Sequence, residues 1–238
     1  MELRIWQRFF MIDAGGIIMI YVTGDLHGDI TRLETFRMRR LKRDDKLIIC
    51  GDFGFLWDNG ENEKKALEKL AKKRFTILFV DGSHENFDLL EQYPVEEWNG
   101  GKVRRIRDNI FHLMRGQVFA LEGKTFFTFG GGESPEKQMR IEAGCWWEHE
   151  MPDIHEMDKG VENLYQHNLT VDYIITHSPY PGAGRRFEDP RERTPLETYF
   201  EEVAKTVKYK KWYFGSLHID RNYSSRHIAV FEAVLPIE

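Results

Sequence analysis

The sequence predicts an α/β fold in which short strands alternate with helices. From residue 17 onward, short apolar runs and amphipathic stretches follow one another, which is the pattern of strands connected by crossover helices. Closely spaced apolar runs with turn residues between them occupy residues 103–129. The composition, with 41% hydrophobic and 31% charged residues, is that of an ordinary globular protein and excludes disordered, collagen-like and coiled-coil chains.

The first part of the chain is predicted to be a βαβαβ unit. Residues 17–23, 46–50 and 76–80 are short apolar runs, and we expect a strand at each. Residues 29–41 and 61–74 have amphipathic patterns, and we expect a helix over each. The basic side chains at the end of the first of these helices are interpreted as a solvated face.

The second part adds a run of antiparallel strands and then further helices and strands. Asp108-Asn109 and Glu122-Gly123 provide turns between the closely spaced strands. The expected strands are 103–107, 110–114, 118–121, 125–129, 171–176, 211–214 and 227–233. The expected helices are 86–92, 154–167 and 195–207. No repeat or linker divides the chain, so we expect a single domain over residues 19–238.

Length, charge and cysteine content limit the class of protein. A chain of 238 residues can bury a sizeable core without disulfides, and two cysteines, Cys50 and Cys145, favour a reducing, cytoplasmic location. The net charge of -5 argues against a general nucleic-acid binding surface. Residues 1–18 are interpreted as an N-terminal extension without assigned function, because Asp13 and two glycines interrupt an apolar run too short to span a membrane.

Acidic and imidazole side chains follow the predicted strands at the points where the strands end. In an open α/β sheet the carboxyl ends of the strands converge on one crevice, so we expect these side chains to meet there. A mixture of carboxylate and imidazole ligands suits Mn, Fe, Zn or Co better than Ca or Mg. The candidates are Asp25, His27, Asp52, His84, His177 and His218.

A glycine stands directly before or just ahead of the candidate ligands after several strands. We expect each of these glycines to let the chain turn sharply as it leaves its strand. The glycines are Gly24, Gly51, Gly82 and Gly215.

The order of these motifs resembles that of the calcineurin-like metallophosphoesterases over residues 19–230. Members of that family carry Asp-x-His, Gly-Asp, Gly-Asn-His-Asp/Glu, a later His, and Gly-His-x-His. The corresponding blocks here are Gly24-Asp25-Leu26-His27-Gly28, Gly51-Asp52, Gly82-Ser83-His84-Glu85, Thr176-His177 and Gly215-Ser216-Leu217-His218.

The resemblance implies a four-layer α/β/β/α sandwich of two mixed β-sheets flanked by helices, with two metals at the strand ends. It implies that Asp25, His27 and His218 bind the first metal, that Asp52 bridges both metals, and that His177 binds the second. His84 would contact the substrate, stabilise the phosphate and protonate the leaving oxygen. The expected chemistry is in-line attack of metal-bound hydroxide on a phosphomonoester or phosphodiester.

Two ligand positions of the second metal depart from the family pattern. Ser83 replaces the family's Asn, and Ser216 replaces the first His of Gly-His-x-His. A hydroxyl is a poorer ligand for these metals than an imidazole. We therefore expect one tight metal site and a second site that is weak or empty. The alternative is a catalytically impaired relative that binds a phosphorylated ligand or partner.

The remaining features bear on the substrate. The Asp and Arg that follow Gly-Asp in protein Ser/Thr phosphatases are absent after Asp52, which argues against a standard protein phosphatase. Arg185 and Arg186 are candidate phosphate contacts, with an exposed charged loop as the alternative. The aromatic side chains at Phe53–Trp57 and Trp146–Trp147 are assigned to core packing or a hydrophobic rim rather than to stacking on a base. We expect a small phosphorylated substrate, with nucleotides among the candidates.

Overall fold

The protein is a four-layer α/β/β/α sandwich in a computed structural model that describes residues 18–179, 182 and 193–238. Its strands are β1 (Ile20–Thr23), β2 (Lys46–Cys50), β3 (Thr76–Val80), β4 (Val95–Trp98), β5 (Gly101–Arg107), β6 (Ile110–Leu113), β7 (Gln117–Leu121), β8 (Lys124–Phe129), β9 (Tyr173–Thr176), β10 (Lys211–Phe214), β11 (Arg221–Asn222), β12 (His227–Ala229) and β13 (Leu235–Ile237). Its α-helices are α1 (Glu61–Ala71), α2 (Phe87–Leu90), α3 (Lys137–Glu142), α4 (Ile154–Gln166) and α5 (Pro195–Thr206). Three 3₁₀ turns are η2 (Ile30–Leu33), η3 (Met38–Arg40) and η4 (Glu148–Glu150).

Both sheets are mixed. The first sheet has the order β13-β1-β2-β3-β6-β5-β4, and the second has the order β11-β12-β10-β9-β8-β7. β1, β2, β3 and β6 run parallel in the first sheet, as do β8, β9, β10 and β12 in the second. The outer strands of each sheet are antiparallel to their neighbours. Because the central strands of each sheet are parallel, the carboxyl ends of β1, β2 and β3 lie at one edge of the first sheet. The carboxyl ends of β9 and β10 lie at the adjacent edge of the second sheet.

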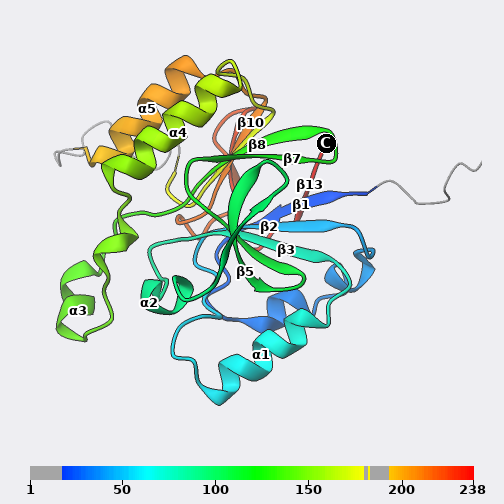
Figure 1. Ribbon diagram of the computed structural model, residues 1–238. Coiled ribbons are helices and arrows are strands. Elements are labelled where there is room, and N and C mark those ends of the chain that lie inside the picture. Colours follow the sequence, from blue (N-terminus) through cyan, green and yellow to red (C-terminus); the bar gives the residue numbers. More distant parts are fainter. Residues whose placement is uncertain (1–17, 180–181, 183–192) are drawn as a thin grey trace, which may run out of the picture.

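Three layers of apolar side chains hold the sandwich together. One layer lies between the two sheets and includes Ile48, Phe126 and Ile175. The second packs the outer face of the first sheet against α1, and the third packs the second sheet against α4 and α5. Figure 1 shows α4 and α5 on one side of the paired sheets and α1 on the other. Burial of this apolar surface is the main contribution to the stability of the fold. The order of the layers confirms the expected α/β/β/α arrangement.

The two long helices after residue 150 begin at well-defined caps. Asp153 and Glu156 form a capping box at the start of α4, and Thr194 and Glu197 form one at the start of α5. Pro195 occupies the first turn of α5, where its missing N–H costs nothing. These signals explain why the expected starts at residues 154 and 195 are confirmed.

The helix expected over residues 29–41 is wrong. Two separate 3₁₀ turns, η2 and η3, occupy that segment. Side chains bind carbonyl groups that a continuous helix would need: Lys73 Nζ donates to the Leu33 carbonyl at 2.8 Å, and Arg39 Nε donates to the Glu34 carbonyl at 3.1 Å. Burial of Leu33 and Met38 against the first sheet stabilises the irregular path.

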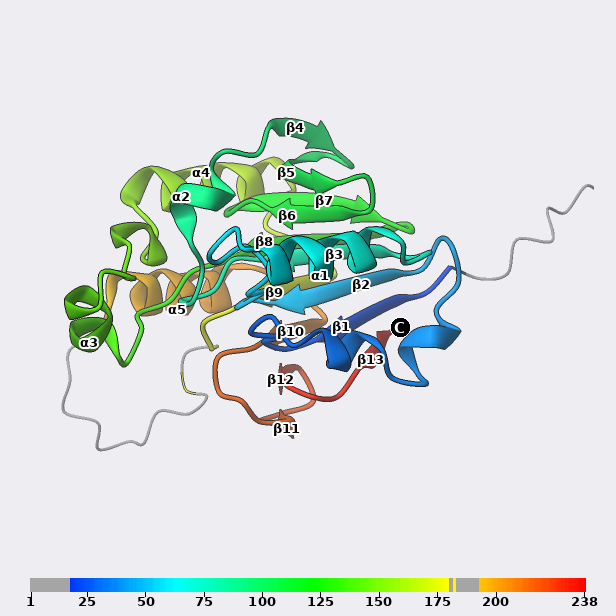
Figure 2. The ribbon, with the colours of Figure 1, turned by 90° about the horizontal axis from the view of Figure 1, so that it is seen from below.

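Several short elements were absent from the sequence prediction. They are β4, β11, β13 and α3, and the strand expected over 227–233 ends at Ala229. β4 forms a hairpin with β5, and the other two short strands pair at sheet edges. Figure 2 shows α3 on an arm that projects beyond the sheets. No helix within the described ranges is both long and apolar enough to cross a membrane.

Candidate metal centre

Six acidic and imidazole side chains gather where five parallel strands end. Asp25 and His27 follow β1, Asp52 follows β2, and His84 follows β3 in the first sheet. His177 follows β9 and His218 follows β10 in the second sheet. The two sheets therefore bring these groups together from opposite sides, within one site. Their individual roles as ligands or catalytic groups stay predictions.

Asp25, His27 and His218 form the first group. Nε2 of His27 lies 3.0 Å from Nε2 of His218, and the latter atom lies 3.4 Å from Oδ2 of Asp25. One ligand atom from each of the three residues can therefore contact a single ion. The backbone N–H of Ser216 donates to Asp25 Oδ2 at 2.9 Å and orients that carboxylate.

The two oxygens of Asp52 face different histidines. Oδ2 lies 3.6 Å from Nε2 of His27, and Oδ1 lies 3.7 Å from Nε2 of His177. The backbone N–H of His84 donates to Oδ1 at 2.8 Å. The charges on His177 and His84 and these hydrogen bonds outweigh burial and lower the pKa of Asp52, so it is ionised at neutral pH. A bridging ligand requires a carboxylate of this kind, with one oxygen toward His27 and the other toward His177.

His177 is buried between the two carboxylates. Its Nδ1 points at the carbonyl oxygen of Cys50, 3.1 Å away, and lies 3.2 Å from Asp25 Oδ1. Burial lowers the pKa of His177, but the charge of Asp52 and the contact with Asp25 outweigh it and raise the pKa to about 10. The two neighbouring carboxylates therefore favour positive charge at this position.

Ser83 and Ser216 lie differently relative to the second predicted site. Oγ of Ser83 is 3.5 Å from Nε2 of His177, on the side that faces Asp52. Ser216 is exposed, and its backbone N–H is the group that contacts the site. Ser83 thus has its hydroxyl near the predicted second site, whereas the contact made by Ser216 is to Asp25.

The donor set fits a divalent cation. Asp25 is fully buried and Asp52 is 2% exposed, and two carboxylates so deeply buried require compensating positive charge. Oδ1 of Asp25 accepts no hydrogen bond although it is buried. The imidazole nitrogens of His27 and His218 also converge at hydrogen-bonding distance. Carboxylate oxygens and imidazole nitrogens in this mixture suit transition metals.

The backbone at the site is strained. Nine described non-glycine residues have positive φ, and four of them belong to this site: His27, Asp52, Ser216 and His218. Such conformations persist only where surrounding contacts enforce them, and they concentrate at functional sites. The strain is therefore independent support for a functional role of this edge.

The glycines of the motifs act mainly through close packing. Only Gly51 among Gly24, Gly51, Gly82 and Gly215 has a positive φ, so a left-handed backbone requires glycine only at that position. A Cβ at Gly82 would collide with Asp52, and one at Gly215 would collide with Asp25. Glycine is needed there because the carboxylates lie directly against the backbone.

Two buried polar side chains, Arg140 from outside the motifs and Glu85 from within one, support the loops at the site. Nη1 of Arg140 donates to the Ser83 carbonyl at 2.6 Å and to Glu150 Oε2 at 3.0 Å. Arg140 comes from α3, some sixty residues along the chain, so only folding reveals its contact with the site. Glu85 accepts from the Phe53 N–H at 2.8 Å, and burial together with nearby Asp52 raises the pKa of Glu85 well above its usual range.

A second buried network contains His112. His112 Nε2 lies 2.9 Å from Asp81 Oδ1, and the Arg115 guanidinium binds Asp81 Oδ2 at 2.7 and 2.9 Å. Despite burial, the charges of Arg115 and His112 hold the pKa of Asp81 below its usual range. The signal that could have predicted this network is Asp81 itself, an acidic residue at the end of β3 directly before the Gly82-Ser83-His84 motif.

The remaining predicted residues fall into two groups. Arg185 and Arg186 lie outside the described residues. Phe53 and Phe55 are buried, which confirms core packing, and Cys50 is buried between the two sheets. Trp57 is half-buried and lies edge-to-face with Trp147, the two ring centroids being 5.7 Å apart.

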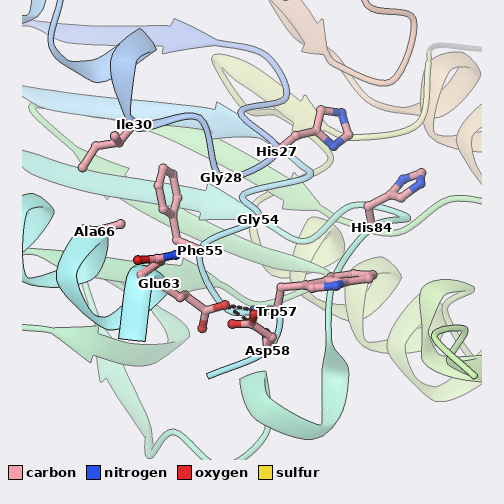
Figure 3. Close-up of a pocket in the computed structure, with 11 residues that line it drawn as sticks. His27, Gly28, Ile30, Gly54, Phe55, Trp57, Asp58, Glu63, Ala66 and His84 are labelled. Carbon is pink, nitrogen blue, oxygen red and sulfur yellow. Dashed lines mark hydrogen bonds between the residues drawn. The ribbon is translucent and has the colours of Figure 1, made fainter. Parts of the chain in front are cut away.

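A cavity of about 540 Å³ opens beside the six side chains. Its lining includes His27 and His84 from the centre and the rings of Phe55 and Trp57. Figure 3 shows the two histidines on one side of this cavity and Ile30 and Ala66 on the other. The volume is in the range that accommodates a small molecule.

Comparison with known proteins provides one family match and two similar structures. The model of the calcineurin-like phosphoesterases matches residues 18–218. The structure of the "Putative 5'-Nucleotidase from Staphylococcus aureus in complex with alpha-ketoglutarate" is 15% identical with a TM-score of 0.46, over 90% of this chain and 48% of that chain. This chain thus spans about half the length of that protein. The Phosphopantetheinyl Hydrolase from Mycobacterium tuberculosis is 15% identical with a TM-score of 0.39, over 90% of this chain and 89% of that one. No curated protein sequence matches the chain.

Proposed function

The chain belongs to the calcineurin-like phosphoesterase family, and we propose that it is a metal-dependent phosphoesterase that hydrolyses a small phosphomonoester or phosphodiester at a centre with one tight and one weak metal site. The observation that carries this proposal is the convergence of Asp25, His27 and His218 beside Asp52. A metal held there supplies Lewis-acid activation and charge neutralisation for the phosphate.

Each side chain has a distinct part in the proposed reaction. Asp25, His27 and His218 would hold the first metal, and Asp52 with His177 would provide ligands for the weaker second site. His84 lines the cavity, and its Nδ1 lies 3.3 Å from Asp52 Oδ2. It would donate a hydrogen bond to the phosphate and a proton to the departing alcohol oxygen.

Metal content and hydrolysis test the proposal together. We expect purified protein to retain about one transition metal per chain, because the first site has three strong ligands besides Asp52. With added Mn it should hydrolyse an aryl phosphate or a bis-aryl phosphate, measured by release of the phenol. Protein that binds metal yet stays inert across a wide Mn range would favour the non-catalytic alternative, a binder of phosphorylated ligands.

Replacing Ser83 and Ser216 by the residues that the family carries there should strengthen metal binding at the second site. Ser83→Asn combined with Ser216→His should raise the metal content from about one to about two ions per chain and increase hydrolysis at low Mn. Histidine is among the residues that tolerate the positive φ found at Ser216. Elemental analysis and Mn titration of activity provide the measurements. Each single variant is the control, and a double variant that still holds one ion would mean that the serines do not limit the site.

A further inference from the structure

We propose that the cavity beside the centre binds the alcohol portion of the substrate and selects an aromatic alcohol that carries a positive charge or an N–H donor. The inference rests on the proposed phosphoesterase function and adds the class of substrate. It is argued from the position of the cavity, its aromatic walls and the charges on its rim.

The cavity and the candidate centre share two side chains. His27 and His84 line the cavity, and both contact Asp52, at 3.6 and 3.3 Å. A phosphate held at the centre would therefore have its leaving oxygen near His84 and its alcohol portion inside the cavity. Figure 3 shows the ring of Trp57 below His84, and the ring of Phe55 on the other side of the view, near Ile30.

The indole of Trp57 lines the cavity, and contacts within the protein fix its position before any ligand binds. Its backbone N–H donates to Glu63 Oε2 at 2.6 Å, and its carbonyl accepts from Asn86 Nδ2 at 2.7 Å. The ring of Trp147 packs edge-to-face against it, and the guanidinium of Arg140 lies 5.9 Å from its centroid. A ring fixed in this way loses little entropy when it stacks on a ligand.

The inner part of the cavity is apolar. Phe55 is 1% exposed, packs edge-to-face on Phe53, and presents its ring to the space shared with Ile30 and Ala66. These side chains offer no hydrogen bond to a hydroxyl-rich alcohol such as glycerol or a bare sugar. An aromatic ring, by contrast, would bury apolar surface against the side chains of Phe55 and Trp57.

The charges on the lining are negative. Asp58 and Glu63 line the cavity, and no lysine or arginine does so within the described part of the chain. Asp58 Oδ1 accepts from Gly60 N at 2.7 Å, and Glu63 Oε2 accepts from two backbone N–H groups. The other oxygen of each carboxylate has no donor among the described residues and can accept from a ligand. A second anionic group on the alcohol would be repelled, whereas an amine or N–H donor would be attracted.

A matched series of phosphate monoesters tests this selection. We would compare ethyl phosphate, benzyl phosphate, 4-(aminomethyl)benzyl phosphate and 4-carboxybenzyl phosphate with Mn-loaded protein, because their leaving alcohols have similar reactivity. Benzyl phosphate should exceed ethyl phosphate in kcat/KM by about tenfold. The aminomethyl ester should exceed the carboxy ester by about tenfold.

Two variants test whether the cavity causes the preference for the benzyl ester and the preference for the aminomethyl ester. Trp57→Leu should lower the ratio of benzyl to ethyl phosphate about tenfold. Asp58→Asn, an exposed position whose amide oxygen can still accept from Gly60, should lower the preference for the aminomethyl ester. Glu61→Gln, in the first turn of α1 but outside the cavity lining, is the matched control and should alter neither ratio.

A binding measurement separates failure of the cavity from failure of the reaction. Saturation-transfer NMR should detect 4-(aminomethyl)benzyl alcohol on the protein, and Trp57→Leu should weaken the signal. Equal turnover of all four esters would overturn the cavity proposal and leave the phosphoesterase standing. Binding of the alcohol without hydrolysis of any ester would support the cavity and contradict the proposed function. Absence of both would overturn both.

Discussion

Asp52→Asn is expected to reduce hydrolysis about 1000-fold or more, the largest effect of any single substitution in the protein. The amide keeps the shape of the side chain and can still accept the His84 N–H that now lies 2.8 Å from Oδ1. It removes the buried negative charge that faces both His27 and His177. Loss of that charge should weaken both metal sites together, because the same carboxylate borders each of them.

Metal content and activity should therefore fall together in Asp52→Asn. Elemental analysis after gel filtration measures the first, and phenol release from an aryl phosphate measures the second. Asp108→Asn, an exposed residue in the turn between β5 and β6, makes the same chemical change away from the site and should leave both unchanged. Full activity in Asp52→Asn with normal metal content would exclude a bridging role for this carboxylate.

His84→Ala is expected to reduce hydrolysis about 100-fold, the magnitude of a lost general acid, while leaving the bound metal in place. Nδ1 of His84 lies 3.2 Å from Ser83 Oγ, and Nε2 lies 4.0 Å from Glu136 Oε2. The side chain thus has one nitrogen toward the centre and the other toward Glu136. Its removal deletes the proton donor and leaves the first group of ligands intact.

The same measurement distinguishes a second role for His84. His27, Asp52 and His84 have ligand atoms close enough to hold one ion between them, so His84 is also a candidate ligand. If His84→Ala loses its metal along with its activity, the ligand role is correct and the acid role is wrong. His149→Ala, which removes a histidine that is 65% exposed in its side chain, is the control for both readouts.

The sequence alone predicted the chemical groups of the site because those groups are tied to local signals. Asp25, Asp52 and His177 each follow a buried apolar run, and apolar runs of this length form strands whatever their partners are. β2, β3 and β10 have the predicted bounds. Parallel strands then place their carboxyl ends at one edge of a sheet, so the gathering of the side chains followed from the order of the motifs.

Tertiary structure alone decided the surroundings of those groups. Short edge strands such as β11 and β13 exist only because a neighbouring strand pairs with them. Within residues 29–41, the distant side chain of Lys73 binds the Leu33 carbonyl, which a continuous helix would need. The contact of Arg140 with Ser83 and the wall formed by Trp57 likewise join segments far apart in the chain. Periodicity reports the faces of single elements, whereas these features depend on packing between elements, which no local pattern encodes.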